Sequence, residues 1–188
     1  MRTRYVLLLI LLPLAIYCLT GCSGSPKKRE RSRISDSEFI NLFNENKEKL
    51  NKCAEILYSK PDFWKSIDKD RTTNWSLDLN KSYHHDFGEE SWHIVDDTLN
   101  ILKPEAVWYD VNICDRNLPM IGFDFVSSDS KPHKGYWKMI DLLYIPSTYR
   151  IDGNKYEYLK KLLQQSWIED DLIMLDYDWY YTIHEENR

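Results

Sequence analysis

The sequence predicts an α+β fold, in which an N-terminal amphipathic helix and one or two further helices pack on a mainly antiparallel sheet of four to six strands. Apolar residues recur at helical spacing in the first half of the domain, and they alternate with period two in segments that begin at Ala106 and Met120. Gly, Pro, Ser and Asp separate the alternating segments, as is typical of turns. Helices and a sheet that are each apolar on one face form a stable domain by packing those faces together.

The first helix is expected to begin at a capping box and to end near Tyr58, before Pro61. The Ser35 side chain can accept from the amide of Glu38, while the Glu38 side chain reaches back to Ser35. Beyond this start, one helix face is apolar and the opposite face is charged. The apolar face consists of Phe39, Ile40, Phe43, Leu50, Cys53, Ala54 and Leu57.

Two more helices are predicted, over residues 89–102 and 156–167, because both segments carry apolar residues at helical spacing. Pro104 follows the first of these segments and ends the helix. Residues 62–86 have no steady period, so we expect a loop with short structure there.

The predicted strands alternate apolar and polar residues, which is typical of a half-buried sheet. Residues 115–119 form a turn between the first two strands, and residues 127–135 form the next loop, so the first three strands make a meander. The last two strands form a hairpin around residues 176–178. The expected strands cover residues 106–113, 120–126, 135–145, 172–175 and 179–183.

The first 21 residues have the three parts of a secretory signal peptide. Arg2 and Arg4 form its positive region, and residues 5–19 form an apolar core that is too short for a stable membrane span. Small residues precede Cys22. We therefore expect residues 1–21 to be a lipoprotein signal peptide that is removed on export.

The segment Leu19-Thr20-Gly21-Cys22 resembles the lipobox of bacterial lipoproteins. This resemblance implies that Cys22 becomes the first mature residue, with a diacylglyceryl group on its sulfur and a further acyl chain on its amine. Two acyl chains already give stable attachment, so the anchor is expected to be permanent. In Gram-negative lipoproteins an aspartate after the cysteine typically causes retention in the inner membrane. Ser23 therefore favours the periplasmic face of the outer membrane.

Residues 22–34 are expected to be a flexible basic tether between the anchor and a single globular domain, residues 35–188. Residues 23–33 lack apolar side chains and carry Gly, Ser, Pro and charge. Five of the residues between Lys27 and Arg33 are cationic. Each can gain about 1 kcal/mol beside anionic lipid headgroups, or they only keep the tether solvated.

The globular part is markedly acidic. The whole chain has a formal charge of −5, but residues 34–188 alone carry 18 cationic and 29 anionic side chains, or −11. Such a field repels nucleic acid and anionic glycans and attracts cationic protein surfaces or metal ions. We therefore expect no nucleic-acid partner. Aromatic residues make up 14% of the chain, and their first use in a small domain is core packing.

Two cysteines, Cys53 and Cys114, are left in the predicted domain, because Cys18 leaves with the signal and Cys22 is the anchor. An exported pair can form a disulfide, and closing this long loop would stabilise the fold by about 4 kcal/mol. Cys53 falls on the apolar stripe of a helix, whereas Cys114 has the parity of a strand. Two buried thiols are therefore the alternative to a bridge.

The densest set of metal-type ligands lies between residues 84 and 93. Glu89 and His93 are spaced i, i+4 and would share a helix face. However, no zinc signature is present, and adjacent histidines are expected to point apart, so we expect no metal or cofactor. A solvated helix start explains the same residues, which are His84, His85, Asp86, Glu89 and His93.

The acidic and aromatic C-terminal segment could supply paired carboxylates for glycoside hydrolysis or an aromatic platform for a sugar. No spacing there fixes such a pair, and a core hairpin with acidic turns explains the same residues. The mature chain also lacks a Gly-rich phosphate loop, an HExxH motif, a nucleophile elbow and a CxxC pair, so catalysis is disfavoured. The segment contains Trp167, Glu169, Asp170, Asp171, Asp176, Asp178, Trp179, Tyr181 and His184.

Taken together, these features favour non-catalytic protein binding in the cell envelope. A small acidic domain on a short permanent anchor resembles bacterial immunity lipoproteins, which neutralise toxins delivered to the periplasm. The resemblance rests on layout and on the terminal Trp-Tyr-Tyr strand, and it transfers no functional residues. It implies a basic protein partner. The alternatives are an accessory envelope lipoprotein that binds cell-wall glycan or an assembly machine, and a carboxylate- or metal-dependent hydrolase.

Overall fold

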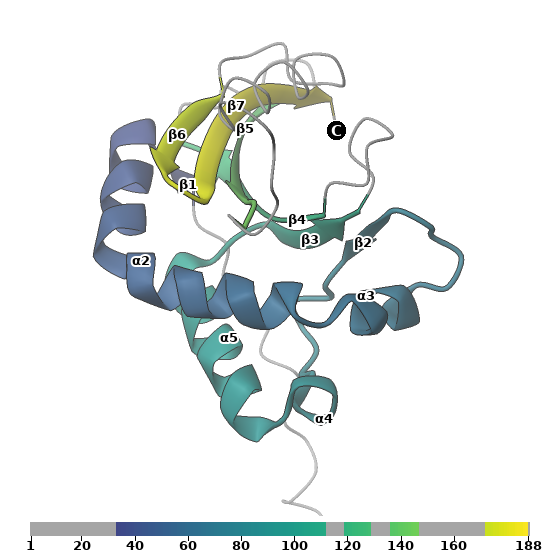
Figure 1. Cartoon of the computed structure of the whole chain (residues 1–188). Helices are drawn as coiled ribbons and strands as arrows, with labels where there is room; N and C mark the ends of the chain where they lie inside the picture. The colour runs from purple at the N-terminus through teal and green to yellow at the C-terminus, as the bar shows by residue number, and fades with distance from the viewer. Residues whose placement is uncertain (1–32, 112–118, 129–135, 147–171, 188) are drawn as a thin grey trace, which may run out of the picture.

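A computed structural model describes residues 33–111, 119–128, 136–146 and 172–187, which form helices on one face of a curved sheet (Figure 1). The predicted α+β class is confirmed. The helices are α2 (Asp36–Tyr58), α3 (Pro61–Ile67), α4 (His84–Phe87) and α5 (Glu89–Leu102). The strands are β1 (Arg33–Ile34), β2 (Asn74–Ser76), β3 (Ala106–Asp110), β4 (Met120–Ser127), β5 (Tyr136–Tyr144), β6 (Ile173–Asp176) and β7 (Trp179–Asn187).

The sheet has the strand order β2-β3-β4-β5-β7-β6, and every neighbouring pair in it is antiparallel. β3, β4 and β5 form the predicted meander, and β6 and β7 form the predicted hairpin. β1 lies off this path and pairs in parallel with the end of β4, where Arg33 is opposite Val126. The last two residues of the predicted tether therefore belong to the sheet.

The two long helices lie where the sequence predicts them. At the start of α2, the Ser35 amide donates to Glu38 Oε2 at 2.9 Å and the Glu38 amide donates to Ser35 Oγ at 3.4 Å, so the capping box is confirmed. α5 ends at Lys103, which has a positive φ of 50° and precedes Pro104. Capping thus fixes the start of one helix and a left-handed residue fixes the end of the other.

Residues 62–86, predicted as a loop with short structure, contain β2 and most of α3 and α4. Pro61 occupies the first turn of α3, where its missing N–H costs nothing. Trp64 is fully buried, and its Nε1 donates to the carbonyl oxygen of Leu57 at 2.9 Å. Packing against the end of α2, and not a regular sequence period, therefore positions this segment.

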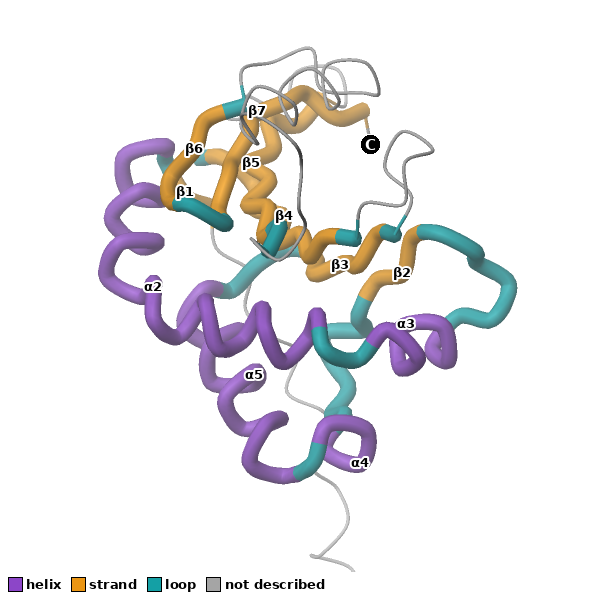
Figure 2. Tube along the Cα trace, viewed as in Figure 1, coloured by secondary structure: helices purple, strands orange, loops and turns teal. Residues whose placement is uncertain are grey.

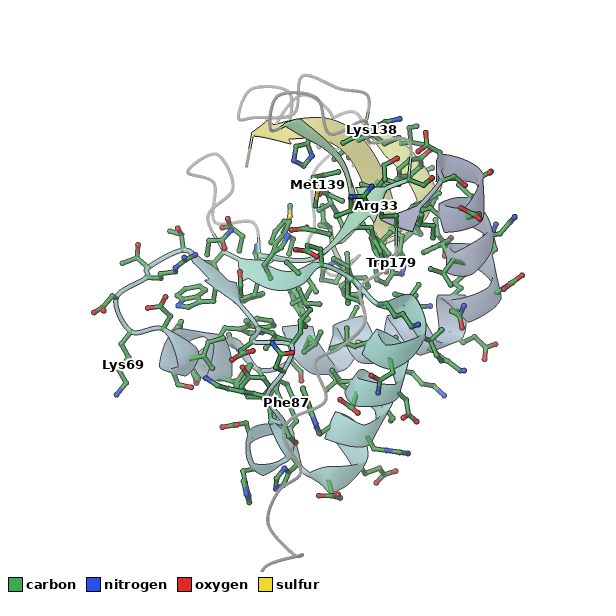
Figure 3. The ribbon with its side chains drawn as sticks, turned by 180° about the vertical axis from the view of Figure 1, so that it is seen from behind. Arg33, Lys69, Phe87, Lys138, Met139 and Trp179 are labelled. Atoms are coloured by element: carbon green, nitrogen blue, oxygen red, sulfur yellow. The ribbon has the colours of Figure 1, made fainter. Side chains whose placement is uncertain are left out.

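The core lies between α2, α5 and one face of the sheet. Phe39 of α2 contacts the rings of Phe125 and Tyr181, with ring centroids 5.5 and 5.4 Å apart. Trp179 is completely buried, and its Nε1 donates to Asn51 Oδ1 at 2.6 Å (Figure 3). Because each buried aromatic side chain removes 150–250 Å² from water, the sheet and α2 form one cohesive unit.

The helices lie on the outer side of the curved sheet, and its concave side carries none of the described helices (Figure 2). Side chains alternate between the two sides of each strand. Val107, Phe123 and Leu142 belong to the core beside the helices. Their neighbours Trp108, Asp124 and Asp141 therefore point to the concave side.

Several predictions concern residues outside the described ranges: the signal peptide, the lipobox with Cys22, the helix over 156–167 and Cys114. Cys53 is buried in α2, as its place on the apolar stripe indicates. The Cys53–Cys114 bridge stays a prediction. Within the described ranges, no helix has the length and hydropathy of a membrane span.

Candidate functional site

The candidate metal ligands between residues 84 and 93 do not converge. The rings of His84 and His85 lie with their centroids 3.8 Å apart, so the expectation that these adjacent histidines point apart is wrong. His84 Nδ1 is 3.0 Å from Ser82 Oγ, and the exposed His93 pairs with Asp97 at 3.3 Å. In the parts of the chain that the structure describes, no group of three or more His, Cys, Asp or Glu residues is arranged to hold a metal ion.

The C-terminal acidic residues also separate. Asp176 Oδ2 lies 2.6 Å from Lys47 Nζ of α2, and the hydrogen bond from Lys47 lowers the pKa of the Asp176 carboxyl below its usual value. Trp179 is a core residue, so it is no sugar platform. His184 lies instead on the concave side of the sheet. Trp167 and Glu169 to Asp171 fall outside the described ranges.

A polar pocket of about 330 Å³ opens on the concave side of the sheet, and we call it the carboxylate pocket. Five strands contribute to it, from the edge strand β2 to β7. Met139, which marks its position in Figure 3, is almost completely buried. The pocket is lined by Asn74, Ser76, Trp108, Asp124, Met139, Asp141 and His184.

The strand register brings two carboxylates side by side. Asp124 of β4 is directly opposite Asp141 of β5, and Asp141 is directly opposite Thr182 of β7. Opposite residues on one face of an antiparallel pair have Cβ atoms roughly 5 Å apart. Like charges at this spacing destabilise a sheet unless hydrogen-bond donors or positive charges compensate them. Repulsion between Asp124 and Asp141 therefore destabilises the pocket, and the residues that contact the two carboxylates compensate for it.

Trp108 supplies the donor for Asp124. The indole Nε1 donates to Asp124 Oδ1, and the ring lies over Gly122, its partner on β4. A Cβ atom added to Gly122 would lie 2.1 Å from Cε2 of Trp108. Glycine is therefore required here because the indole occupies the space of a side chain, and this close approach orients the Asp124 carboxylate.

His184 is the neighbour of Asp141. Its Nδ1 lies 3.2 Å from Asp141 Oδ2, and the Asp141 side chain is only 4% exposed. The distance suits an ion pair, although the contact does not have the alignment of a hydrogen bond. Because an ionised carboxylate is costly to bury without compensation, a protonated His184 would stabilise Asp141 in its charged form.

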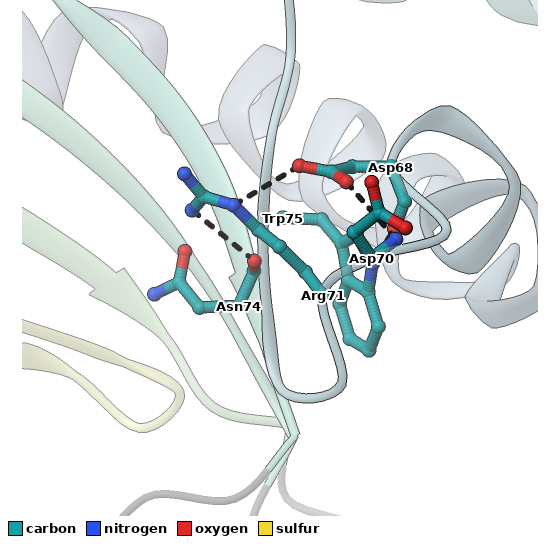
Figure 4. A network of polar contacts seen from close by, with 5 residues as sticks. All are labelled: Asp68, Asp70, Arg71, Asn74 and Trp75. Atoms are coloured by element: carbon teal, nitrogen blue, oxygen red, sulfur yellow. Dashed lines mark hydrogen bonds and ion pairs between the residues drawn. The ribbon is translucent and has the colours of Figure 1, made fainter.

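The edge strand β2 forms the rim of the carboxylate pocket. Arg71 connects β2 to the preceding loop. Its Nε lies 3.1 Å from Asp68 Oδ2, and a guanidinium nitrogen donates to the carbonyl oxygen of Asn74 at 3.4 Å (Figure 4). The Asn74 amide donates to Asp110 Oδ2 at 3.2 Å. Ser76, two residues on, is exposed. The rim thus offers a positioned amide and a hydroxyl.

The β6–β7 hairpin exposes a second kind of surface. In the described residues β6 ends the sheet, and Ile173, Met174 and Tyr177 are 41%, 52% and 67% exposed. Ile101 of α5, at 39%, is the other large apolar side chain exposed in the described ranges. We call Ile173, Met174 and Tyr177 the hairpin surface. Ile173 and Met174 follow one another in β6 and project from its two sides, so this surface surrounds the edge strand and does not lie on one face of the sheet.

A larger hollow of about 420 Å³ lies between α2, the end of α5 and β1. Its lining mixes charges of both signs, from Arg33 and Lys103 to Glu38 and Glu45, with apolar helix residues. These charged residues are exposed or half-buried, whereas Asp141 of the carboxylate pocket is buried, so the hollow is the weaker candidate.

Sequence reasoning missed Asp124 and Asp141, although each leaves a signal. Both interrupt strands in which almost all the other residues of described burial are buried, on either face. A carboxylate in such a strand is rarely accidental, because its burial must be compensated. Comparison of the chain with protein-family models, curated proteins and solved structures gave no match.

Proposed function

We propose that this chain is a lipid-anchored protein of the bacterial envelope whose domain binds a basic protein partner without catalysis, as immunity-type lipoproteins bind their toxins. Cys22 carries the anchor, and the periplasmic face of the outer membrane is its location. The observation that carries the binding function is the apolar hairpin surface on the last strand of the described sheet.

An edge strand presents backbone N–H and C=O groups that can pair with a strand of another protein. Proteins that avoid such pairing usually place charged residues or proline on the edge. The one charged residue of β6, Asp176, is paired with Lys47, whereas Ile173 and Met174 are exposed, and Tyr177 is the most exposed large apolar residue in the adjoining turn. Aromatic and Met side chains are enriched in protein interfaces.

Charge favours a basic partner for this surface. Residues 34–188 carry a formal charge of −11, and Glu169, Asp170 and Asp171 precede β6 in the sequence. Complementary charge raises the association rate and selects against acidic partners, so affinity is expected to fall as salt rises.

Crosslinking from the hairpin surface tests this proposal. A photo-reactive amino acid replaces Met174 in the full chain, expressed in its native envelope, and the same residue replaces the exposed Asp62 as a control. We expect position 174 to capture a basic protein that position 62 does not. The captured protein is then purified and titrated with the full chain at low and high salt.

Two matched variants decide whether the hairpin surface makes the contact. Met174→Lys places a positive charge on it, and Ile101→Lys makes the same change at an exposed apolar residue of α5, outside the hairpin surface. We expect the first to weaken binding about tenfold or more and the second to leave it unchanged. Equal effects, a salt-independent affinity, or capture of cell-wall assembly components alone would contradict the proposed function.

A further inference from the structure

The carboxylate pocket is a second place where this chain has the features of a binding site. It is a hollow of about 330 Å³, within the size range of small-molecule sites, and its polar groups come from five strands of one rigid sheet. Asp141 and Trp108 in its wall are 3% and 6% exposed. Buried polar groups that converge on a hollow are the usual features of a small-ligand site.

A buried hydroxyl beside the pocket provides an independent indication. Thr182 is fully buried next to Asp141, on the same side of the sheet, and its Oγ1 has no hydrogen-bond partner among the described residues. A buried hydroxyl without a partner is destabilising, so such groups are normally paired with protein, water or ligand. Thr182 is not part of the pocket lining, so its hydroxyl becomes paired only when a water or a ligand group enters beside Asp141.

The lining narrows the chemistry of that molecule. Two carboxylates repel phosphates and other anions, and the polar lining does not suit an apolar ligand. Asp124 and Asp141 accept hydrogen bonds, whereas the Asn74 amide, the Ser76 hydroxyl and the second ring nitrogen of His184 can also donate. A ligand whose groups both donate and accept matches this mixture, and hydroxyl groups do so.

The pocket also has an apolar part. Met139 and the edge of the Trp108 indole line it next to the carboxylates. A sugar ring has hydroxyl groups at its rim and C–H groups on its faces, so it can contact both kinds of surface at once. We infer that the carboxylate pocket binds a neutral saccharide of one or two rings, held by Asp124 and Asp141. This second binding function does not depend on the proposed protein partner.

The test measures binding of named sugars to the full chain purified in detergent. D-Glucose, D-galactose, D-mannose, N-acetyl-D-glucosamine and their β-1,4-linked disaccharides are screened by saturation-transfer NMR, and each hit is titrated by calorimetry. Putrescine and calcium chloride are titrated in parallel as purely cationic ligands. We expect at least one sugar to bind at one site with a dissociation constant of ~1 mM.

Variants locate the bound sugar. Asp124→Asn and Asp141→Asn remove one charged acceptor each and are expected to weaken binding about tenfold or more. Ser76→Phe blocks the rim from an exposed position on an edge strand, so it leaves the core intact even if Asp141→Asn fails to fold. Asp62→Asn, whose carboxylate is 96% exposed on α3, is the matched control and should bind as the original chain does.

The inference is overturned if none of the sugars binds, or if binding persists unchanged in Asp124→Asn and Ser76→Phe. It is also overturned if only putrescine or calcium binds at the pocket, because a ligand recognised by charge alone would then occupy it. Circular dichroism of each variant confirms that lost binding is not lost folding.

Discussion

The packing of Trp108 on Gly122 makes a sharp prediction about stability. In Gly122→Ala the new methyl group would lie 2.1 to 2.7 Å from three atoms of the indole, well inside van der Waals contact. Trp108 lies on a sheet surface where it is only 6% exposed, so the ring has little room to move aside. The indole must shift, and its hydrogen bond to Asp124 is then lost.

The expected cost follows from these two effects. Forcing an extra methyl group into a packed site costs about 1–3 kcal/mol. Losing a hydrogen bond to a carboxylate costs about 1.5–3 kcal/mol. Gly122→Ala should therefore lower the free energy of unfolding by roughly 2.5–6 kcal/mol if both losses are complete. A domain of this size has a total stability of about 5–15 kcal/mol, so the effect is large.

The same substitution in a chain that lacks the Trp108 indole tests whether the indole causes the loss of stability. In Trp108→Ala the space above residue 122 is open, and Gly122→Ala should then be neutral or stabilising by up to about 1 kcal/mol, because alanine restricts the unfolded chain. Urea unfolding of the four chains, followed by circular dichroism, gives the coupling energy. If Gly122→Ala costs the same with and without the indole, the close approach is not the reason for the glycine.

Three further outcomes are expected. Cys22→Ser should move the protein from the membrane fraction to the soluble fraction and abolish labelling by palmitate, whereas retention in the membrane would contradict the lipobox prediction. Ser35→Ala removes the side-chain cap of α2 and should lower the unfolding free energy by about 1 kcal/mol in urea titrations, and an unchanged midpoint would show that the cap is dispensable. Lys47→Met should destabilise the protein at pH 7 by less than about 1 kcal/mol, because both partners of the Lys47–Asp176 pair are more than one third exposed. Since the pair lowers the folded-state pKa of Asp176 below 3.8, its contribution is present at neutral pH and lost as the pH falls below that value. Unfolding of both chains at pH 7 and pH 2.5 checks this, and a deficit that persists in acid would exclude the ion pair as its source.

Local patterns predicted most of the described secondary structure. Ser35 and Glu38 fix the start of α2 because a capping box is a contact between near neighbours in sequence. The period-two alternation from residue 120 to 126 likewise reports a strand with one face in the core. α3 and β2 had no such signal, since the burial of Trp64 and Trp75 depends on elements distant in sequence.

The carboxylate pocket could not be predicted from the sequence, for a related reason. Its central pair, Asp124 and Asp141, exists through the register of β4 against β5. A shift of one residue would send one of the carboxylates to the opposite side of the sheet. Register depends on how the whole sheet packs, so residue types alone did not bring these two positions together. The sequence analysis grouped His184 with the acidic C-terminal residues, but Asp176 of that group pairs with Lys47 of α2, away from the pocket.

The pairing of β1 with β4 sets the length of the proposed tether. Arg33 and Ile34 fasten the chain to the sheet, with the Ser128 amide donating to the Ile34 carbonyl at 2.8 Å. With an anchor at Cys22, the chain between the lipid and Arg33 spans at most about 40 Å even when fully extended. If Cys22 is lipidated as proposed, a partner therefore binds no further from the bilayer than this tether length plus the size of the domain, so the protein would act close to the membrane surface.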